Sequence, residues 1–503
     1  MLRRGSAPEH FFLPKNSANL SPMSKKVFLS SSIPYVNAKP HIGHALEFVQ
    51  ADAMVRYRRL MGDELFFTSG TDDNALKNVL KAEEAGEDVA EYVHRHADTF
   101  RKLCVELNIK YDYFTETSQD EQHRRGAVKL WEAAVKSGNI YEKEYEGIYC
   151  VGCEEFKTEK DLNKNGECPE HPGKKPEVVQ EKNYFFKLSK YQDKLLTLIE
   201  SDELKITPEA KKNEILSFVR GGLEDFSVSR SVERARGWGI LVPGNDSQVM
   251  YVWFDALSNY INALGYADNS ENYTKFWKES DERIHVIGKG INRFHTVYWP
   301  AMLLSADIPL PTTVFVHGYF TVDGQKMSKT LGNIIDPEEL ISKYGTDAVR
   351  YYFLRHAHPF EDSDVTLEKF KEAYNANLVN GLGNLTARIM KMAEDNLDSP
   401  IERPESVGFD KEYTAALDNF EFQNAMDFVW KKVGELDERI TAEEPFKLVK
   451  EDKEKGVTII QELLRDLYAI GRMLFPFMPE TNVKIKEAVL ANKKPENLFK
   501  RLD

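Results

Sequence analysis

Two histidines flank a glycine early in the chain, in the segment His41-Ile42-Gly43-His44. The segment follows a short apolar run, Val27-Phe28-Leu29, and an amphipathic pattern typical of a helix starts at Gly43. A helix N-terminus carries unpaired backbone N–H groups and a partial positive charge, which suits a phosphate. Imidazole N–H groups there can donate hydrogen bonds as charge moves onto phosphate oxygens. Because histidines can also cap or pack against a turn, this short motif must be interpreted with the rest of the chain.

A second segment with phosphate-binding chemistry lies at Lys326-Met327-Ser328-Lys329-Thr330. It follows an Asp323-Gly324 turn signal after the last apolar strand pattern. Lysines three positions apart on such a loop can reach a triphosphate as mobile point charges. A lysine-rich loop is usually a solvated surface, but this one follows a strand of the sheet that we expect to hold His41. The two segments therefore predict two halves of one nucleotide site.

Cysteine and histidine form a third constellation, Cys150-x-x-Cys153 and Cys168-x-x-His171, with 14 residues between the pairs. Two close ligand pairs separated by a short loop are typical of a closed tetrahedral zinc site with three thiolates and one imidazole. All four ligand positions are filled by protein, which predicts one structural zinc ion per chain. The fourth cysteine, Cys104, lies in an apolar helical pattern and is expected to be a core thiol.

Strands and helices must position these residues, and their patterns alternate over the first part of the chain. Strand patterns at 27–29, 64–67, 284–288 and 313–316 and helix patterns at 73–85 and 89–107 predict a doubly wound parallel sheet. Such a sheet binds ligands at the carboxyl ends of its strands, where His41 and Asp72 fall. From Leu367 onward only helical patterns follow, at 377–395, 410–436, 456–474 and 482–491, which predicts a bundle.

These patterns divide the 503 residues into several regions. We expect a disordered extension (1–24), the first half of the α/β domain (25–140), an insertion with a zinc knuckle (141–245), the second half of the α/β domain (246–325), a lysine loop with a linking region (326–370) and a helical domain (371–503).

Composition indicates a soluble protein, with 42% hydrophobic residues and no apolar run near the roughly 20 residues that span a bilayer. We expect no membrane partner and a cytoplasmic location, because four cysteines in this arrangement suit a reducing compartment. Arg3, Arg4 and nearby serines leave a mitochondrial transit peptide as an alternative, and Met23 is a second possible start. The net charge of −14 argues little about nucleic acid, because binding depends on local surface charge.

The two phosphate segments resemble the two signatures of the class I aminoacyl-tRNA synthetases, with Thr330 where serine is usual. Further segments make the chain similar to the methionyl-tRNA synthetases in particular: 34–37, 251–257, 287–289, 294–295 and 377–388, with the zinc knuckle. The resemblance runs colinearly from Lys25 to Asp503. It implies a Rossmann-like catalytic domain split by a zinc-knuckle insertion, a stem-contact region and an all-α anticodon-binding bundle.

The resemblance also implies the roles of individual residues. ATP, with Mg²⁺, would contact His41, Gly43, His44, Lys326, Ser328 and Lys329, and the catalytic groups would be His41, His44, Lys326 and Lys329. The methionine pocket would consist of Ile33, Tyr35, Asp72, Trp253, Ala256, Tyr260, Ile291 and His295, whose aromatic rings suit a thioether and whose carboxylate suits an ammonium group. The anticodon readers would be Asn384, Arg388 and Phe446.

By resemblance, the expected enzyme activates L-methionine with ATP to methionyl-adenylate and transfers it to initiator and elongator tRNA-Met. The chain ends without the oligonucleotide-binding appendage that makes some relatives dimers, so we expect a monomer. Three departures put individual contacts in doubt: Asn74-Ala75 replaces a usual His-Gly, Gly290 a usual Asp, and Phe446 a usual Trp.

Three other interpretations stay open. A sister class I synthetase for Leu, Ile, Val or Cys would need a large editing insertion or a zinc ion in its catalytic pocket. A small nucleotidyltransferase with the same histidine turn would not need the helical bundle. A catalytically dead tRNA-binding relative would be expected to have lost His41, His44, Lys326 or Lys329, all of which are present.

Overall fold

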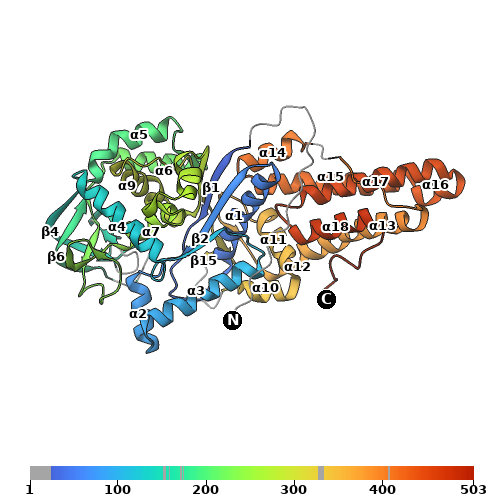
Figure 1. The fold of residues 1–503 in the computed structure, drawn as a ribbon. Helices are drawn as coiled ribbons and strands as arrows, with labels where there is room; N and C mark the ends of the chain where they lie inside the picture. Colours follow the sequence, from blue (N-terminus) through green and yellow to red (C-terminus); the bar gives the residue numbers. More distant parts are fainter. Residues whose placement is uncertain are drawn as a thin grey trace, which may run out of the picture.

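The computed structural model describes residues 24–150, 155–157, 159–169, 173, 175–326, 334–405 and 408–502. Its centre is a parallel sheet (Figure 1), with strand order β3 (Tyr113–Glu116), β2 (Glu64–Thr71), β1 (Lys26–Ser31), β12 (Glu282–Gly288), β13 (Thr313–His317) and β7 (Lys205–Thr207). The predicted doubly wound sheet is confirmed. β2 continues through Thr71, so its end delivers Asp72 directly to the edge where ligands bind.

The two faces of the sheet belong to two hydrophobic cores because successive side chains of a strand point in opposite directions. Val27 and Leu29 pack into the core shared with α1 (Ile42–Leu60), α3 (Val89–Glu106) and the C-terminal helices. Phe28 packs into the other core, with α4 (Glu121–Lys136), α7 (Val252–Asn262) and α9 (Trp299–Ser305). Both faces of β1 are therefore covered, as its continuous apolar sequence requires.

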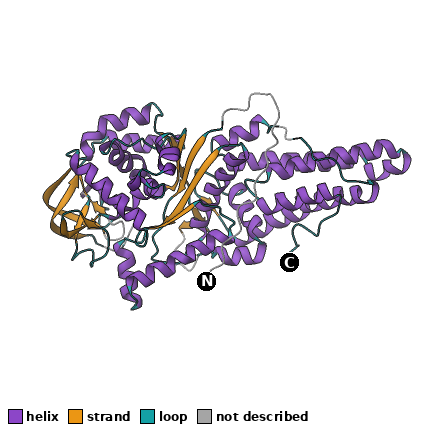
Figure 2. Cartoon of the chain, in the orientation of Figure 1, coloured by secondary structure: helices purple, strands orange, loops and turns teal. Residues whose placement is uncertain are grey.

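In sequence, an antiparallel lobe lies between the first three strands of the central sheet and β12 and β13. In space it lies on the side of the sheet away from the helical bundle (Figure 2). Its strands are β4 (Ile140–Cys150), β5 (Glu155–Lys157), β6 (Glu177–Phe186) and β8 (Phe226–Ser227), accompanied by β9 (Ser229–Ser231), β10 (Leu241–Val242) and β11 (Asn245–Met250). The helices α5 (Gln192–Glu200) and α6 (Glu209–Arg220) follow β6. Between them β7, although it falls in the range predicted for the insertion, pairs in parallel with β13.

The connection from the sheet to the bundle passes through a small second sheet. β14 (Phe320–Val322) pairs with β15 (Gln325–Lys326) in antiparallel and with β16 (Ser363–Asp364) in parallel orientation. The helices α10 (Pro337–Tyr344) and α11 (Thr346–Arg355) lie between them in sequence. The lysine segment starts at Lys326, nine positions after β13 ends at His317, so it begins close to the end of that strand.

The C-terminal part is helical, as predicted. It contains α12 (Leu367–Ala373), a π-helix (Tyr374–Gly383), α13 (Asn384–Asn396), α14 (Lys411–Asp418), α15 (Phe422–Glu443), α16 (Pro445–Glu451), α17 (Lys453–Met473) and α18 (Pro479–Ala491). The single helix expected over 410–436 was wrong. Phe420 adopts a left-handed φ of 60° and breaks it into α14 and α15. The break places the buried Phe420 ring parallel to Phe315 of β13, with centroids 4.6 Å apart.

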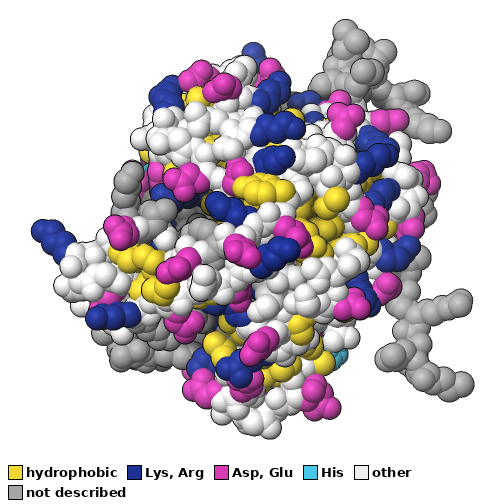
Figure 3. Space-filling view, turned by 90° about the vertical axis from the view of Figure 1, so that its left-hand side faces the viewer, with side chains coloured by type: hydrophobic (Ala, Val, Ile, Leu, Met, Phe, Trp, Pro, Cys, Tyr) yellow, Lys and Arg dark blue, Asp and Glu magenta, His cyan; other side chains and the backbone are white. Residues whose placement is uncertain are grey.

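The surface carries both signs of charge. On the face formed by the antiparallel lobe, Lys and Arg side chains alternate with Asp and Glu and with small apolar areas (Figure 3). Within the described residues no helix is both long and apolar enough to cross a membrane.

Candidate active site

A cavity of about 440 Å³ opens at the carboxyl ends of β1, β2, β12 and β13. All eight residues predicted for a methionine pocket line it, together with three of the predicted phosphate-binding residues: Ile33, Tyr35, His41, Gly43, His44, Asp72, Trp253, Ala256, Tyr260, Ile291 and His295. These residues come from segments more than 250 positions apart in the chain. The fold therefore brings the predicted methionine-binding residues and the histidine half of the predicted phosphate site into one space.

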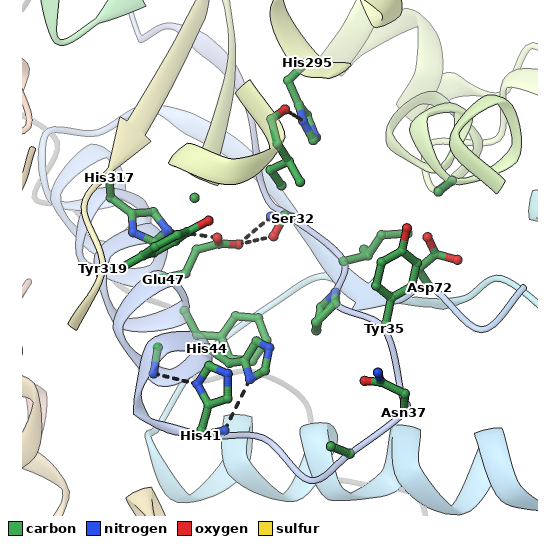
Figure 4. A pocket seen from close by; sticks show the side chains of 18 of the residues that line it. Ser32, Tyr35, Asn37, His41, His44, Glu47, Asp72, His295, His317 and Tyr319 are labelled. Carbon is green, nitrogen blue, oxygen red and sulfur yellow. Dashed lines mark hydrogen bonds and ion pairs between the residues drawn. The ribbon is translucent and has the colours of Figure 1, made fainter. Parts of the chain in front are cut away.

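His41 and His44 cap the first turn of α1 reciprocally. The Nδ1 atom of His41 accepts the Gly43 N–H at 3.0 Å, and Nδ1 of His44 accepts the His41 N–H at 3.2 Å. Their rings stack with centroids 4.0 Å apart (Figure 4). The histidines therefore do cap a turn, and the same geometry also orients both rings beside the helix N-terminus.

Both imidazoles are neutral at physiological pH. Burial lowers the pKa of His41 to about 4 and lowers the pKa of His44 well below its usual value. Since each Nδ1 accepts a backbone N–H, the single ring proton lies on Nε2. Each histidine can thus donate one hydrogen bond from Nε2 to a phosphate oxygen without carrying charge of its own.

The inner wall of the cavity is also neutral. The Nδ1 of His295 lies 3.0 Å from the carbonyl oxygen of Ile291, so this nitrogen carries the proton, and Nε2 accepts the Tyr260 hydroxyl at 2.6 Å. Burial lowers the pKa of His295 to about 4 and raises that of Tyr260 well above its usual value. Two fixed neutral groups beside aromatic rings suit a polarizable thioether.

Aromatic rings form the side of the cavity next to Asp72. Trp253 stacks on Phe294 with ring centroids 3.8 Å apart, and Tyr35 meets Trp253 edge to face at 6.3 Å. Tyr35 pairs with Asp72 in an isolated parallel bridge, which holds the buried carboxylate at the end of β2. A carboxylate in this position can balance the charge of an amino acid's ammonium group.

Sequence reasoning missed a polar group on the opposite side of the cavity, made by Glu47, His317 and Tyr319 (Figure 4). One carboxylate oxygen of Glu47 accepts the Ser32 N–H at 2.7 Å and the Ser32 hydroxyl at 2.5 Å. The other lies 2.9 Å from Nε2 of His317. The signal in the sequence was a carboxylate three residues after His44, one helical turn farther along α1.

Asn74, which replaces a usual histidine of the family, follows two positions after the cavity residue Asp72. The Asn74 amide donates to the Asp255 carboxylate at 2.7 Å, and His123 contacts the other oxygen of that carboxylate at 2.5 Å. Asp255 and His123 are fully buried, on α7 and α4. Asn74 therefore joins the end of β2 to the helices behind Trp253.

Several predicted residues lie wholly or partly outside the described chain. Ser328, Lys329, Cys153 and His171 are outside it, and of Lys326 only the backbone, at the end of β15, is described. Cys150 and Cys168 are both buried, with 4% and 1% of their surfaces exposed. Within the described part of the chain no group of three or more His, Cys, Asp or Glu is placed to hold a metal.

The three predicted anticodon readers lie on the helical bundle, away from the cavity. Asn384 and Arg388 are exposed on α13, and Arg388 pairs with Asp437 of α15 at 2.5 Å. Phe446 is 43% exposed on α16, at the tip of the bundle opposite the antiparallel lobe (Figure 1). Since Phe446 is a large apolar side chain that solvent can reach, its ring is accessible for stacking.

The parallel sheet is built from two separate parts of the chain, two histidines cap the helix after its first strand, and a helical bundle follows. With the lysine segment of the sequence, this arrangement is that of a class I aminoacyl-tRNA synthetase. A family model described as "tRNA synthetases class I (M)" matches residues 27–174 and 170–390.

Comparisons with individual proteins narrow the class. The proteins named methionine–tRNA ligase of Thermotoga maritima and Brucella suis are each 38% identical to this chain and cover 93% of it, with 76% and 93% of their own lengths. The solved structure of Mycobacterium tuberculosis methionyl-tRNA synthetase in complex with methionyl-adenylate matches with a TM-score of 0.84 and 35% identity, covering 92% of this chain and 93% of that one. The chain belongs to the methionyl-tRNA synthetase family, and as an enzyme it is a methionine–tRNA ligase.

Proposed function

We propose that the cavity binds L-methionine and Mg-ATP together, and that the enzyme then charges both initiator and elongator tRNA-Met. In the first step a methionine carboxylate oxygen attacks the α-phosphorus of ATP, forming methionyl-adenylate and releasing pyrophosphate. In the second, the terminal ribose hydroxyl of the tRNA attacks the acyl carbon and AMP leaves. The observation that carries this proposal is that one cavity of about 440 Å³ is lined by all eight predicted methionine-binding residues and by His41, Gly43 and His44.

The described residues act by position and hydrogen bonding, because no covalent intermediate with the protein is required. Asp72 holds the ammonium group, and Tyr260 and His295 lie beside the thioether. The Nε2–H groups of His41 and His44 donate to phosphate oxygens. Lys326, Ser328 and Lys329 complete the phosphate site in this proposal, with Lys329 stabilising the charge on the α-phosphate.

The test is amino-acid-dependent exchange of labelled pyrophosphate into ATP. We expect exchange with methionine and none above background with leucine, and we expect Trp253→Ala to raise the KM for methionine more than that for ATP because Trp253 lines only the amino-acid side. A matched control is Trp131→Phe, at a buried tryptophan outside the cavity. Equal exchange with leucine, or none with methionine, would overturn the proposal.

We also propose one structural zinc ion, held by Cys150, Cys153, Cys168 and His171. Cys150 and Cys168, the two proposed ligands that the structure describes, fit this role because both thiols are buried, as the ligands of a structural zinc site are. The elements between them, β5 and a turn of 3₁₀ helix, are only three residues long. When bound, zinc would crosslink the end of β4 to the loop before β6. Elemental analysis of purified protein should find about one zinc per chain, and Cys168→Ser should lose it. A zinc content far below one per chain would refute the assignment.

For tRNA, we propose that Asn384, Arg388 and Phe446 read the anticodon, with bases stacking on exposed planar groups. Phe446→Ala should reduce kcat/KM for tRNA charging about tenfold and leave pyrophosphate exchange unchanged. Equal charging by Phe446→Ala and the wild type would remove Phe446 from the site. A monomer working in the cytoplasm completes the proposal, with the mitochondrial matrix as the alternative location.

A further inference from the structure

The proposed function leaves one wall of the cavity without an assigned part of either substrate. Tyr35 and Asp72 lie on one side of the cavity, and His295 lies at another. His41 and His44 lie at the N-terminus of α1. The remaining side is formed by Glu47, His317 and Tyr319 (Figure 4). If methionine and the phosphates occupy the first three, the nucleoside of ATP must lie along the fourth. This step rests on the proposed function.

Tyr319 fills a space that two glycines leave open. A Cβ atom at Gly288 would lie 2.9 Å from Cε1 of Tyr319, and one at Gly290 would lie 2.8 Å from its hydroxyl oxygen. Neither glycine has the positive φ that would by itself favour glycine, and φ at Gly288 is −74°. Glycine at both positions is therefore explained by room for the tyrosine rather than by backbone geometry.

The ring is held in place from several directions. The Gly290 N–H donates to the Tyr319 hydroxyl at 2.8 Å, and the Tyr319 N–H donates to Asp362 at 2.9 Å. Lys289 bonds both oxygens of Asp362 at 2.7 Å, and its Nζ lies 5.1 Å from the centroid of the Tyr319 ring. The position of the phenol is thus set before any ligand binds.

The chemistry of this wall suits a sugar. A carboxylate, an imidazole and a phenol line it together, from Glu47, His317 and Tyr319. A phenol oxygen can both donate and accept a hydrogen bond, as can each hydroxyl of a ribose. A base alone would favour stacking surfaces, whereas a diol needs polar atoms at fixed positions.

We propose that Tyr319 is a specificity-determining residue for the nucleoside, binding a ribose hydroxyl of ATP through its phenolic oxygen, in the room provided by Gly290. The residue contacts substrate by one neutral hydrogen bond and takes no part in the transfer of the phosphoryl group. Its loss should therefore weaken ATP binding and leave methionine binding unchanged.

The experiment measures the KM of ATP, 2′-deoxy-ATP and 3′-deoxy-ATP in methionine-dependent pyrophosphate exchange. For the wild type, we expect one deoxy analogue to have a KM about 3- to 10-fold above that of ATP, the range for one neutral hydrogen bond. Tyr319→Phe should raise the KM for ATP by the same factor, abolish the discrimination against that analogue and leave the KM for methionine unchanged.

Two further variants separate ribose binding from simple packing. Gly290→Ala should resemble Tyr319→Phe, because its Cβ displaces the hydroxyl, and the double variant should be no worse than either single variant. The matched control Tyr113→Phe, which removes a phenol bound to Asp120 at the sheet edge, should keep the wild-type ratios.

Unchanged discrimination against both deoxy analogues in Tyr319→Phe would overturn the inference and leave the proposed function standing. An aromatic ring that only stacks on the base gives that result, because phenylalanine keeps the ring. Absence of methionine-dependent exchange in the wild type would instead overturn the proposed function on which the inference rests.

Discussion

Two polar clusters lie along α1, one at its N-terminus and one at its centre, and they differ in whether their side chains are charged. At its N-terminus His41 and His44 give up their charge: burial lowers the pKa of His41 to about 4. Farther along, Asp52 is fully buried, whereas the two histidines are partly buried, yet Asp52 keeps its charge. Burial alone would raise the pKa of Asp52, but the guanidinium groups of Arg350 and Arg56 outweigh it and hold that pKa below its usual value.

The difference follows from what each cluster must do. Arg350, which is fully buried, pairs with Asp52 at 2.8 Å and donates to the carbonyl oxygens of Leu107, Pro476 and Phe477 at 3.1, 2.9 and 2.9 Å. These bonds join α1 to α11 and to the turn before α18. The charged cluster therefore fixes the bundle to the sheet, whereas the neutral cluster leaves room for the charges of a ligand.

The largest effect should come from breaking the charged cluster on one side. Arg350→Met leaves three buried carbonyls without this donor and Asp52 with Arg56 as its one remaining guanidinium partner, so we expect a loss of about 3–5 kcal/mol in the free energy of unfolding. Urea unfolding of the full chain measures it. Asp52→Asn in the same background should add to the loss, because the largely buried Arg56 guanidinium then has no carboxylate partner in the cluster.

The control for Arg350 is Arg220→Met, which removes one partner of an exposed pair with Glu200 and should leave stability unchanged within error. If the free energy of unfolding of Arg350→Met is within about 1 kcal/mol of the wild-type value, the paired charges do not hold the bundle to the sheet. The contrast between the two clusters would then be wrong.

A second prediction concerns pH and His295, a neutral histidine of the cavity outside the two clusters on α1. His295 has a folded pKa of about 4, below the 6.5 of an unfolded histidine, so between these values only the unfolded chain takes up its proton. Its contribution to stability is complete above pH 6.5 and is lost progressively as the pH falls toward 4, by about 3 kcal/mol. Urea unfolding from pH 7.5 to 4.5 should therefore show a smaller loss in His295→Gln than in the wild type.

Buried Asp73 acts in the opposite direction, because burial raises its pKa to about 7 and falling pH then favours the folded chain. The prediction is accordingly the difference between wild type and His295→Gln. Asp52→Asn serves as the comparison, since a carboxyl group with a lowered pKa loses its contribution only below about pH 3.8. Parallel pH curves for the wild type and His295→Gln would show that His295 is not neutral in the fold.

The smallest of the three effects concerns the hydrogen bond between Tyr260 and His295. Tyr260→Phe removes the hydroxyl that donates to Nε2 of His295 at 2.6 Å, and we expect methionine binding to weaken by about 1–2 kcal/mol. We expect the KM for methionine to rise about tenfold and the KM for ATP to stay the same. An equal rise in both KM values would place Tyr260 in general packing instead of the amino-acid pocket.

Much of the fold could be predicted because its central strands and long helices carry clear periodicity. Val27-Phe28-Leu29 reads as a strand buried on both faces, and α3 shows a regular apolar stripe that the structure confirms. The three-residue strand β7 has no such pattern, since only its pairing with β13 makes it part of the sheet. The break at Phe420 was equally hidden, because the stacking with Phe315 that accompanies it lies more than 100 positions away.

Within the site, the wall that we propose for the amino acid was predictable through resemblance, and the wall that we propose for the nucleoside was not. Trp253 and Asp72 lie in short segments that match a family pattern, and they line the cavity as expected. Glu47 and Tyr319 lie outside those matched segments. Gly290 stands out in the sequence as a departure from the family pattern, but nothing there links it to Tyr319 or links Glu47 to His317, 270 positions away. Their place in the cavity follows only from the three-dimensional arrangement of β12, β13 and α1.

The central claim is that one cavity holds both substrates at once, and a non-hydrolysable analogue of methionyl-adenylate tests it directly. Inhibition of pyrophosphate exchange is measured while methionine and ATP are varied in turn. The single cavity predicts that the analogue competes with both substrates. Competition with only one of them would mean that methionine and ATP bind in separate places, and would contradict the account.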